Sequence, residues 1–159
     1  DGMEESGHAL TSLLLEQLGT EDCISAENLD STINEMFLWH GTSREAAEAI
    51  TASGFRIPRG ERATHGKRFG EGAYLAEDLS KSLTYTKPED GIHYVLLCRT
   101  LCGELFYTED NSNTSAHHTA KSGGKDSVLA NPKGEGPREF IVLEESQVYP
   151  EFILKVKLA

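Results

Sequence analysis

Three stretches of the sequence have residue types suited to binding a phosphate-rich ligand or to breaking a bond. The first is "SGGKDS" at 122–127, where two glycines, a lysine and a serine resemble an ATP-binding loop. The second is a run of five Arg and Lys residues between positions 56 and 68. The third is "FLWHGT" at 37–42, an apolar run that ends in a histidine and a glycine. The segments around each stretch decide which of them can serve a ligand.

The "SGGKDS" stretch lacks the setting of a phosphate loop. Such a loop follows a buried strand and opens a helix, whose N-terminus adds its dipole. Here a polar segment precedes it, and the Pro and Gly residues of "VLANPKGEGP" oppose a helix after it. "FGEGAYLA" at 69–76 fails similarly as a dinucleotide fingerprint, because it lacks the third glycine and the following helix. We expect "SGGKDS" to be a surface loop, and an ATP-binding enzyme is the least favoured interpretation.

The basic run and the histidine leave alternatives open. A basic, glycine-containing loop in an acidic chain is either a solvated loop or a lid over an anion such as a pyrophosphate. His40, at the end of an apolar run, can hydrogen-bond a sugar hydroxyl, or it can be a purely structural hydrogen-bonding group. Gly41 leaves its backbone N–H and C=O open to a ligand.

Composition predicts one soluble domain. The chain has 159 residues, of which 38% are apolar and 26% charged. No apolar run approaches the ~20 residues that span a bilayer, so we expect no membrane partner. The net charge of −11 argues against gripping nucleic acid by a general field. Three cysteines give no disulfide framework, which favours a reducing, intracellular compartment, cytoplasmic or nuclear.

The hydrophobic pattern predicts an α+β domain around an antiparallel or mixed sheet. Ser43 is a suitable N-cap and Gly54 a suitable stop for a helix between them. A second helix is predicted at 9–18 and a short one at 79–86, and 109–138 is a long polar, loop-like stretch. Strands are predicted at 36–40, 73–76, 93–101, 105–108, 139–143 and 150–158.

A zinc site can be imagined from Cys98, Cys102, His117 and His118. The two cysteines lie on a predicted strand and its following turn, while the histidine pair falls in a distant polar loop. This spacing does not match a compact ligand set. We therefore expect no metal.

Several segments together resemble the catalytic domain of the poly(ADP-ribose) polymerase family, the diphtheria-toxin-like ADP-ribosyltransferases of the His-Tyr-Glu type. The resemblance runs from residue 36 to the end, and it implies the ADP-ribosyltransferase fold, with mostly antiparallel or mixed β-sheets and a few short helices. Residues 1–35 carry no such resemblance and are predicted to form an N-terminal helical extension packed on a 36–159 catalytic domain. The segments, in order, are "LWHGT", "GFRIP", "FGEGAYLAED", "SKSLTY", "GKDSV" and "REFIVLEESQVYPEFILKVK".

The resemblance also implies a set of site residues. The family's triad is similar to His40, Tyr74 and Glu139. The residues that would bind NAD⁺, the substrate, are Gly41, Thr42, Arg56, Ser82 and Tyr85. In this comparison "GKDSV" is similar to a loop beside the acceptor pocket, with Asp126 where a histidine is common.

The reaction that this resemblance implies breaks the bond between nicotinamide and C1 of its ribose, through an oxocarbenium-like transition state. Tyr74 and Tyr85 would hold the pyridinium ring between two phenol faces. Glu139 would stabilise the positive charge that grows on the ribose. His40 and Thr42 would bind the adenosine ribose, and Arg56 would lie near the pyrophosphate or adenine.

The expected function is therefore an NAD⁺-dependent ADP-ribosyltransferase, a monomeric domain of a larger protein. The expected acceptor is a protein, with nucleic acid as the other option, and the presence of Glu139 is compatible with poly(ADP-ribose) elongation. The alternative is a non-catalytic module that binds NAD⁺ or ADP-ribose. The complete His-Tyr-Glu set argues against that alternative, because a pure binder has no need of Glu139.

Overall fold

The computed structural model describes residues 28–60 and 68–158. The predicted helix at 9–18 lies outside the described residues, as does most of the predicted N-terminal extension. Positions 61–67, the middle of the basic run, lie outside them as well.

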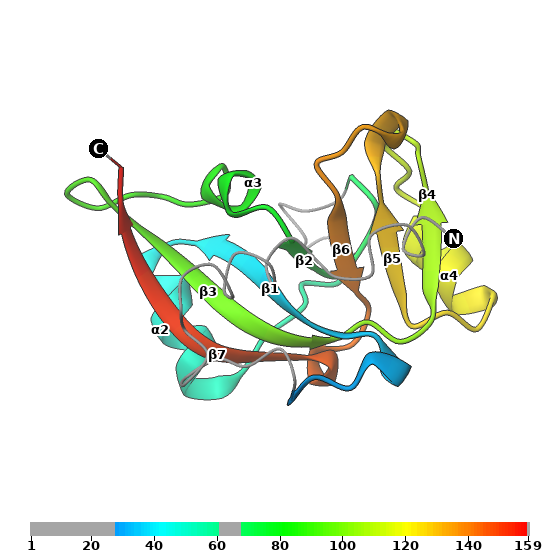
Figure 1. The fold of residues 1–159 in the computed structure, drawn as a ribbon, viewed down its shortest axis with the longest axis horizontal. Coiled ribbons are helices and arrows are strands. Elements are labelled where there is room, and N and C mark those ends of the chain that lie inside the picture. The colour runs from blue at the N-terminus through cyan, green and yellow to red at the C-terminus, as the bar shows by residue number, and fades with distance from the viewer. Residues whose placement is uncertain (1–27, 61–67, 159) are drawn as a thin grey trace.

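Within the described residues, seven strands form one mixed sheet in the order β4-β5-β6-β2-β1-β3-β7. Neighbouring strands are antiparallel except for the parallel pair β4–β5. In Figure 1, β7, β3 and β1 run across the molecule while β6, β5 and β4 stand upright beside them, so the sheet is strongly twisted. This arrangement confirms the predicted α+β fold. The strands are β1 (Glu35–Thr42), β2 (Ala73–Ala76), β3 (Ile92–Leu101), β4 (Leu105–Thr108), β5 (Ser127–Ala130), β6 (Glu139–Val142) and β7 (Val148–Lys157).

The described helices are short. They are α2 (Arg44–Ser53), α3 (Leu79–Leu83) and α4 (Ala116–Ser122), with 3₁₀ turns η2 (Ser31–Ile33), η4 (Pro132–Gly134) and η5 (Glu145–Gln147). The Ser43 side chain caps α2 by accepting a hydrogen bond from the N–H of Ala46, and the helix ends at Gly54, as predicted. Gly54 has a φ of 83°, which a residue without a Cβ adopts at little cost.

Strand β1 is buried on both faces, and alternate residues serve different cores. Met36 and Leu38 pack in one cluster, which also contains Phe55 after α2. Phe37 and Trp39 pack on the other face, and α3 covers them with Leu79 and Leu83. The strand that carries His40 and Gly41 is therefore packed on both faces.

The prediction of a long loop at 109–138 is wrong. This stretch contains α4 and β5, and all four residues of β5 are buried. The signals are weak in sequence, because α4 buries two alanines four positions apart, Ala116 and Ala120, without large apolar residues. Strand β5 is short and lies between glycine-rich segments, so its burial comes from strand pairing on both sides.

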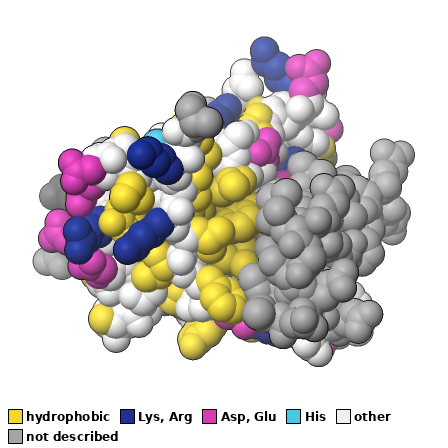
Figure 2. Space-filling view, turned by 60° about the vertical axis from the view of Figure 1, so that its left-hand side comes forward, with side chains coloured by type: hydrophobic (Ala, Val, Ile, Leu, Met, Phe, Trp, Pro, Cys, Tyr) yellow, Lys and Arg dark blue, Asp and Glu magenta, His cyan; other side chains and the backbone are white. Residues whose placement is uncertain are grey.

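Strand β7 forms one edge of the sheet. Leu154 and Val156 pack partly against the Trp39 cluster, whereas Tyr149, Phe152 and Ile153 are exposed. Figure 2 shows apolar side chains gathered on a face of the molecule, with Lys and Arg side chains beside them. Lys155 and Lys157 are exposed on β7, and lysines are common on edge strands that must not pair with other chains. No helix in the described ranges is long and apolar enough to cross a bilayer.

Candidate active site

One face of the sheet brings three of the predicted site residues together. Trp39 of β1 pairs with Ala76 of β2, which in turn pairs with Glu139 of β6. Paired residues of antiparallel strands project to the same face, and so do residues two apart along one strand. Tyr74 and Gly41 therefore lie on the same face as Glu139, the face that α3 covers.

Glu139 is the first residue of β6 and is only 1% exposed. Its neighbours in the ladders are two small residues, Ala76 and Ala130, which leave room for the carboxylate. Oε1 accepts a hydrogen bond from the hydroxyl of Tyr85 at 2.5 Å. Oε2 has no hydrogen-bond partner among the described residues, although Lys81 Nζ lies 3.9 Å away. A buried carboxylate oxygen without a donor is costly, so this oxygen is suited to accept a hydrogen bond from a ligand hydroxyl.

The two tyrosines stay neutral at physiological pH. Burial raises the pKa of both phenols well above the usual value of 10, and the negative charge of Glu139 adds to the rise for each. The hydroxyl of Tyr74 donates to the carbonyl of Gly70 at 2.6 Å and accepts from the N–H of Phe69 at 3.0 Å, so its orientation is fixed. Tyr85 is 46% exposed, which leaves its ring accessible to a ligand.

Gly41 lies in close contact with the end of α3. A Cβ added to Gly41 would come within 1.8 Å of the carbonyl oxygen of Ser82. Ser82 is 1% exposed, and its hydroxyl donates to the carbonyl of Trp39 at 3.0 Å. The glycine therefore allows α3 to pack directly on β1, and the hydrogen bond from Ser82 holds the helix there.

His40 connects β1 to β2 beyond their single register pair. Its Nδ1 lies 2.8 Å from the carbonyl oxygen of Tyr74, and because a carbonyl only accepts, Nδ1 carries the proton. The ring also packs edge-on against Phe55, with ring centroids 5.0 Å apart. Burial lowers the pKa of His40 below its usual value. The neutral ring leaves Nε2 as an acceptor for a sugar hydroxyl.

The other two predicted ligand residues lie further along these segments. Thr42 is half-buried at the end of β1, where it pairs with Tyr94. The side chain of Arg56 is 75% exposed and forms an ion pair with Glu145, with Nη1 3.3 Å from Oε2. Its guanidinium is therefore directed toward η5. In this structure it forms no hydrogen bond with the described residues around Glu139.

The "SGGKDS" stretch lies apart from Glu139. It connects the end of α4 to the start of β5, which is the reverse of the strand-to-helix order of a phosphate loop. Ser127 pairs with Val142, whereas Glu139 pairs with Ala130, so the stretch is three residues, or about 10 Å, along the ladder from Glu139. Asp126 accepts a hydrogen bond from the N–H of Glu104 at 2.8 Å, which ties it to the start of β4.

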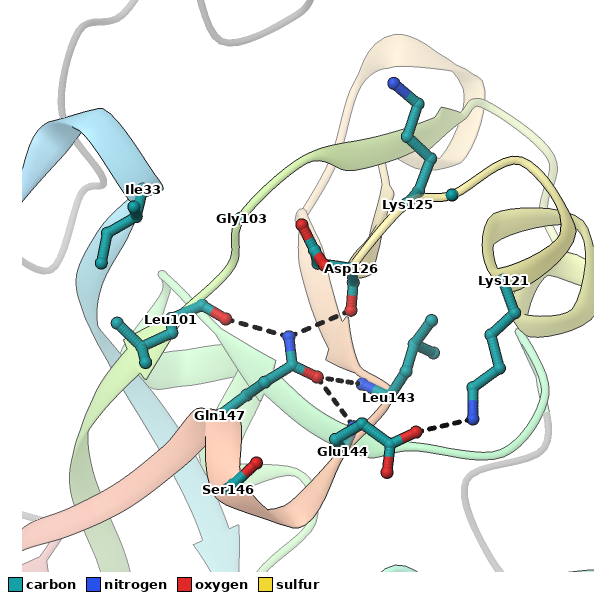
Figure 3. Close-up of a pocket in the computed structure, with 11 residues that line it drawn as sticks. Ile33, Leu101, Gly103, Lys121, Lys125, Asp126, Leu143, Glu144, Ser146 and Gln147 are labelled. Atoms are coloured by element: carbon teal, nitrogen blue, oxygen red, sulfur yellow. Dashed lines mark hydrogen bonds and ion pairs between the residues drawn. The ribbon is translucent and has the colours of Figure 1, made fainter.

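The same segment lines a surface hollow of about 620 Å³. Figure 3 shows Gln147 at its centre, where the side-chain amide bonds the backbone of Leu101, Asp126, Leu143 and Glu144. Lys121 bonds Glu144 at 2.8 Å, and Lys125 bonds Glu104 at 2.8 Å. These polar groups are occupied by one another, so the hollow offers few free groups to a ligand.

The residues considered for zinc do not come together as a ligand set. Cys98 and Cys102 are buried in the main core, and burial raises the pKa of the Cys102 thiol to about 12. His117 and His118 stack on each other in α4, with ring centroids 3.9 Å apart. Within the described part of the chain, no three His, Cys, Asp or Glu side chains form a metal-binding group.

Comparison with known families decides the assignment. The model of the poly(ADP-ribose) polymerase catalytic domain matches residues 4–158 of this chain. The chain belongs to this family. The match confirms the resemblance seen in the sequence and extends it into residues 4–35, where no similarity was evident. NAD⁺ is the substrate of the poly(ADP-ribose) polymerase domain, and the domain is an ADP-ribosyltransferase.

Relatives of this poly(ADP-ribose) polymerase domain include proteins named as mono-ADP-ribosyltransferases and proteins named as poly(ADP-ribose) polymerases. It is 30% identical over 81% of its length to the protein mono-ADP-ribosyltransferase PARP12 of Mus musculus, and 31% identical over 78% to poly [ADP-ribose] polymerase 2 of Arabidopsis thaliana. It is 40% identical over 45% of its length to poly [ADP-ribose] polymerase tankyrase of Caenorhabditis elegans. The chain spans 18%, 20% and 3% of these relatives, respectively.

Sequence reasoning missed Lys81 as a site residue of the poly(ADP-ribose) polymerase domain. Its Nζ lies 3.9 Å from Glu139 Oε2 and 5.3 Å from the centroid of the Tyr85 ring. The side chain is 19% exposed, which is low for a lysine. A signal was present, because Lys81 falls in "SKSLTY", four positions before Tyr85, and residues at that spacing share a helix face.

Proposed function

We propose that this chain transfers ADP-ribose from NAD⁺ to an acceptor, with Glu139 as the residue that stabilises the transition state. The observation that carries the proposal is the state of its carboxylate. It is buried, one oxygen accepts from Tyr85, and the other has no hydrogen-bond donor among residues 28–60 and 68–158. A ribose hydroxyl of NAD⁺ would supply that donor.

The nicotinamide end of NAD⁺ would lie between Tyr74 and Tyr85. The phenols remain neutral, and an aromatic face attracts a pyridinium cation by about 1–2 kcal/mol. The backbone of Gly41 would pair with the carboxamide group. Ser82, whose hydroxyl donates to the Trp39 carbonyl, keeps an oxygen lone pair to accept an N–H of the amide.

Bond cleavage would follow from the change of charge during the reaction. The nicotinamide nitrogen takes the electron pair of the C1–N bond and leaves as a neutral ring, while the positive charge moves to the ribose. A carboxylate close to the ribose stabilises this transition state more than the ground state. The acceptor hydroxyl, thiol or carboxylate then bonds to C1, and any proton it carries passes to Glu139 or to solvent. Hydrolysis is the same reaction with water as the acceptor.

The adenosine end would use His40, with Nε2 accepting a hydrogen bond from a ribose hydroxyl, and Thr42 beside it. Arg56 would need to leave Glu145 to reach the pyrophosphate. The ion pair is exposed, and exposed pairs contribute only about 0–1 kcal/mol, so breaking it costs little free energy. We propose that the basic run as a whole lies near the pyrophosphate.

A protein acceptor fits the net charge of −11 better than a nucleic acid, because the chain as a whole repels phosphate backbones. We propose that the domain acts as a monomer within a larger protein. Whether it adds single units or a polymer depends on how it holds a growing ADP-ribose chain, and Glu139 is compatible with both.

The test is incubation of the protein with adenine-labelled NAD⁺, candidate proteins and RNA, with nicotinamide release measured in parallel. Label on protein together with an equal amount of free nicotinamide supports the proposal, and gel mobility separates single units from polymer. NAD⁺ binding without nicotinamide release would instead indicate a binding module. Binding of ATP in preference to NAD⁺ would contradict both.

A further inference from the structure

A buried ion pair lies next to Glu139 but has no place in the chemistry described above. Arg138 donates through Nη2 to Glu77 Oε2 at 2.7 Å and through Nε to Glu77 Oε1, so the contact is bidentate. The side chains are 15% and 4% exposed, respectively. Removing two charges from water costs a large desolvation free energy, which their mutual attraction has to offset. A well-packed apolar pair at the same place is often equally stable. Folding stability alone therefore gives a weak reason for this pair.

The pair continues the ladder that positions Glu139. The register of β2 and β6 runs from Ala73–Val142 to Ala76–Glu139, and Glu77 and Arg138 stand opposite each other one step further. The backbone pairing of β2 and β6 ends before this step, and the side-chain ion pair connects the two segments there instead. They project to the opposite face from Glu139, in agreement with the Arg138 guanidinium lying 6.0 Å from the Phe140 ring.

The same pair lies directly before the start of α3. Glu77 directly precedes Asp78, whose side chain caps α3 by accepting from the N–H of Ser80. That helix carries Lys81, and the chain then leads to Tyr85, both of which approach the Glu139 carboxylate. Arg138, the residue directly before Glu139, is thus bonded to Glu77, which precedes the segment that supplies Lys81 and Tyr85.

We infer that Arg138 is a positioning residue, which with Glu77 holds Glu139 in register with Tyr85 and Lys81 for the transfer reaction. The inference rests on the proposed role of Glu139. The planar fork of arginine suits this task, because two parallel hydrogen bonds fix both distance and direction. A lysine at position 138 would keep the charge without that geometry.

The experiment measures nicotinamide release and NAD⁺ binding for Arg138→Lys, Arg138→Met and the exchange variant Glu77→Arg/Arg138→Glu, each alone and combined with Glu139→Gln. We expect Arg138→Lys and Arg138→Met to lower kcat by roughly tenfold or more, with KM for NAD⁺ within about twofold. The exchange variant, which keeps the fork, should recover part of the loss. Lys121→Met, which breaks an exposed ion pair with Glu144, is the matched control and should keep kcat unchanged.

The combination with Glu139→Gln distinguishes positioning from general support of the fold. If Arg138 acts through Glu139, then Arg138→Met should change the residual rate of Glu139→Gln by less than about twofold, because effects on one functional unit are not additive. Equal losses in both backgrounds, or no loss in the wild-type background, would overturn the inference. A Glu139→Gln variant with wild-type kcat would instead overturn the proposed function, and the inference with it.

An unfolded variant is recognised by thermal unfolding of each protein. Arg138→Lys is the variant to interpret if Arg138→Met does not fold, since it keeps the positive charge against buried Glu77. A folded Arg138→Lys protein with wild-type kcat contradicts the inference by itself.

Discussion

The hydroxyl of Tyr85 donates a hydrogen bond to Oε1 of Glu139, and this contact joins two segments that are 54 positions apart in the sequence. Tyr85 follows α3, whereas Glu139 begins β6. The bond holds one oxygen of the carboxylate, while the second oxygen has no donor in the part of the chain that the structure describes. This division between one occupied and one open oxygen underlies the function proposed above.

Replacement of Tyr85 by Phe should separate the hydroxyl from the ring. The ring remains to stack on nicotinamide, so the Kd for NAD⁺ should change by less than about threefold. The lost hydrogen bond to a charged group should lower kcat by about tenfold to a hundredfold. Steady-state kinetics with calorimetric binding gives both values. Tyr149→Phe, at an exposed tyrosine of β7, is the matched control, and equal kcat for the two variants would contradict the role of this bond.

Replacement of Lys81 by Met should keep most of the packing of this half-buried segment while removing the charge near Glu139. We expect kcat to fall by roughly tenfold, because a fixed positive charge within 4 Å helps to orient the carboxylate. Lys121→Met, which breaks an exposed pair with Glu144, should have the kcat of the wild type. A Lys81→Met protein as active as the control would show that Lys81 is only a neighbour of the site.

Replacement of Gly41 by Ala should disrupt the contact between β1 and α3. The new Cβ would meet the backbone oxygen of Ser82 at 1.8 Å, so the helix or the strand has to move. We expect the free energy of unfolding to fall by about 1–3 kcal/mol and NAD⁺ binding to be lost. Chemical denaturation measures the first and calorimetry the second.

Gly123→Ala is the control for that prediction. A Cβ at Gly123 would lie 3.2 Å from its nearest neighbour, the carbonyl oxygen of Thr119, and the backbone is not left-handed. Its unfolding free energy should change by less than about 1 kcal/mol. If Gly41→Ala behaves like this control and still binds NAD⁺, the close approach of α3 to Gly41 is not needed for the site.

The lowered pKa of His40 predicts how stability depends on pH. Its usual pKa is 6.5, and burial lowers it in the folded protein, so the unfolded chain takes up the proton first as the pH falls. Above pH 6.5, His40 is neutral in both states and the folded protein keeps its full stability. Below pH 6.5, protonation of His40 in the unfolded chain lowers the free energy of unfolding, down to the folded-state pKa. The measurement is the unfolding free energy of the wild type and of His40→Gln between neutral and acidic pH.

The difference between those two curves isolates His40. His117 also has a lowered pKa, from burial and then from the charge of His118, and its contribution is present in both proteins. The wild type should lose stability with acidification more steeply than His40→Gln. Parallel curves below pH 6.5 would show that burial does not lower the pKa of His40.

Much of the fold was evident from the sequence wherever large apolar residues mark an element. The apolar run of β1, the alternation of β7 and the cap and stop of α2 all predicted elements that the structure contains. The exceptions are α4 and β5, because alanines and a four-residue strand carry little signal. Their place depends on pairing with β4 and β6, which are distant in sequence, and local patterns do not report such contacts.

The site was less predictable than the fold. The expectation that Glu139 lies at the start of a strand is confirmed, but its burial depends on Ala76 and Ala130 in the neighbouring strands. The same holds for Lys81, which looked like an ordinary surface lysine until α3 placed it near the carboxylate. The roles of His40, Tyr74 and the other candidate residues remain predictions for the measurements above.

The most direct test of the account compares Glu139→Gln with Glu104→Gln at saturating NAD⁺. Both substitutions remove one negative charge, but Glu104 has a side chain that is 72% exposed and pairs with Lys125. If Glu139 stabilises the transition state, Glu139→Gln should lower the kcat for nicotinamide release by about a hundredfold or more, with the Kd for NAD⁺ within about threefold, and Glu104→Gln should change neither. Equal rates of nicotinamide release for the two variants would contradict it.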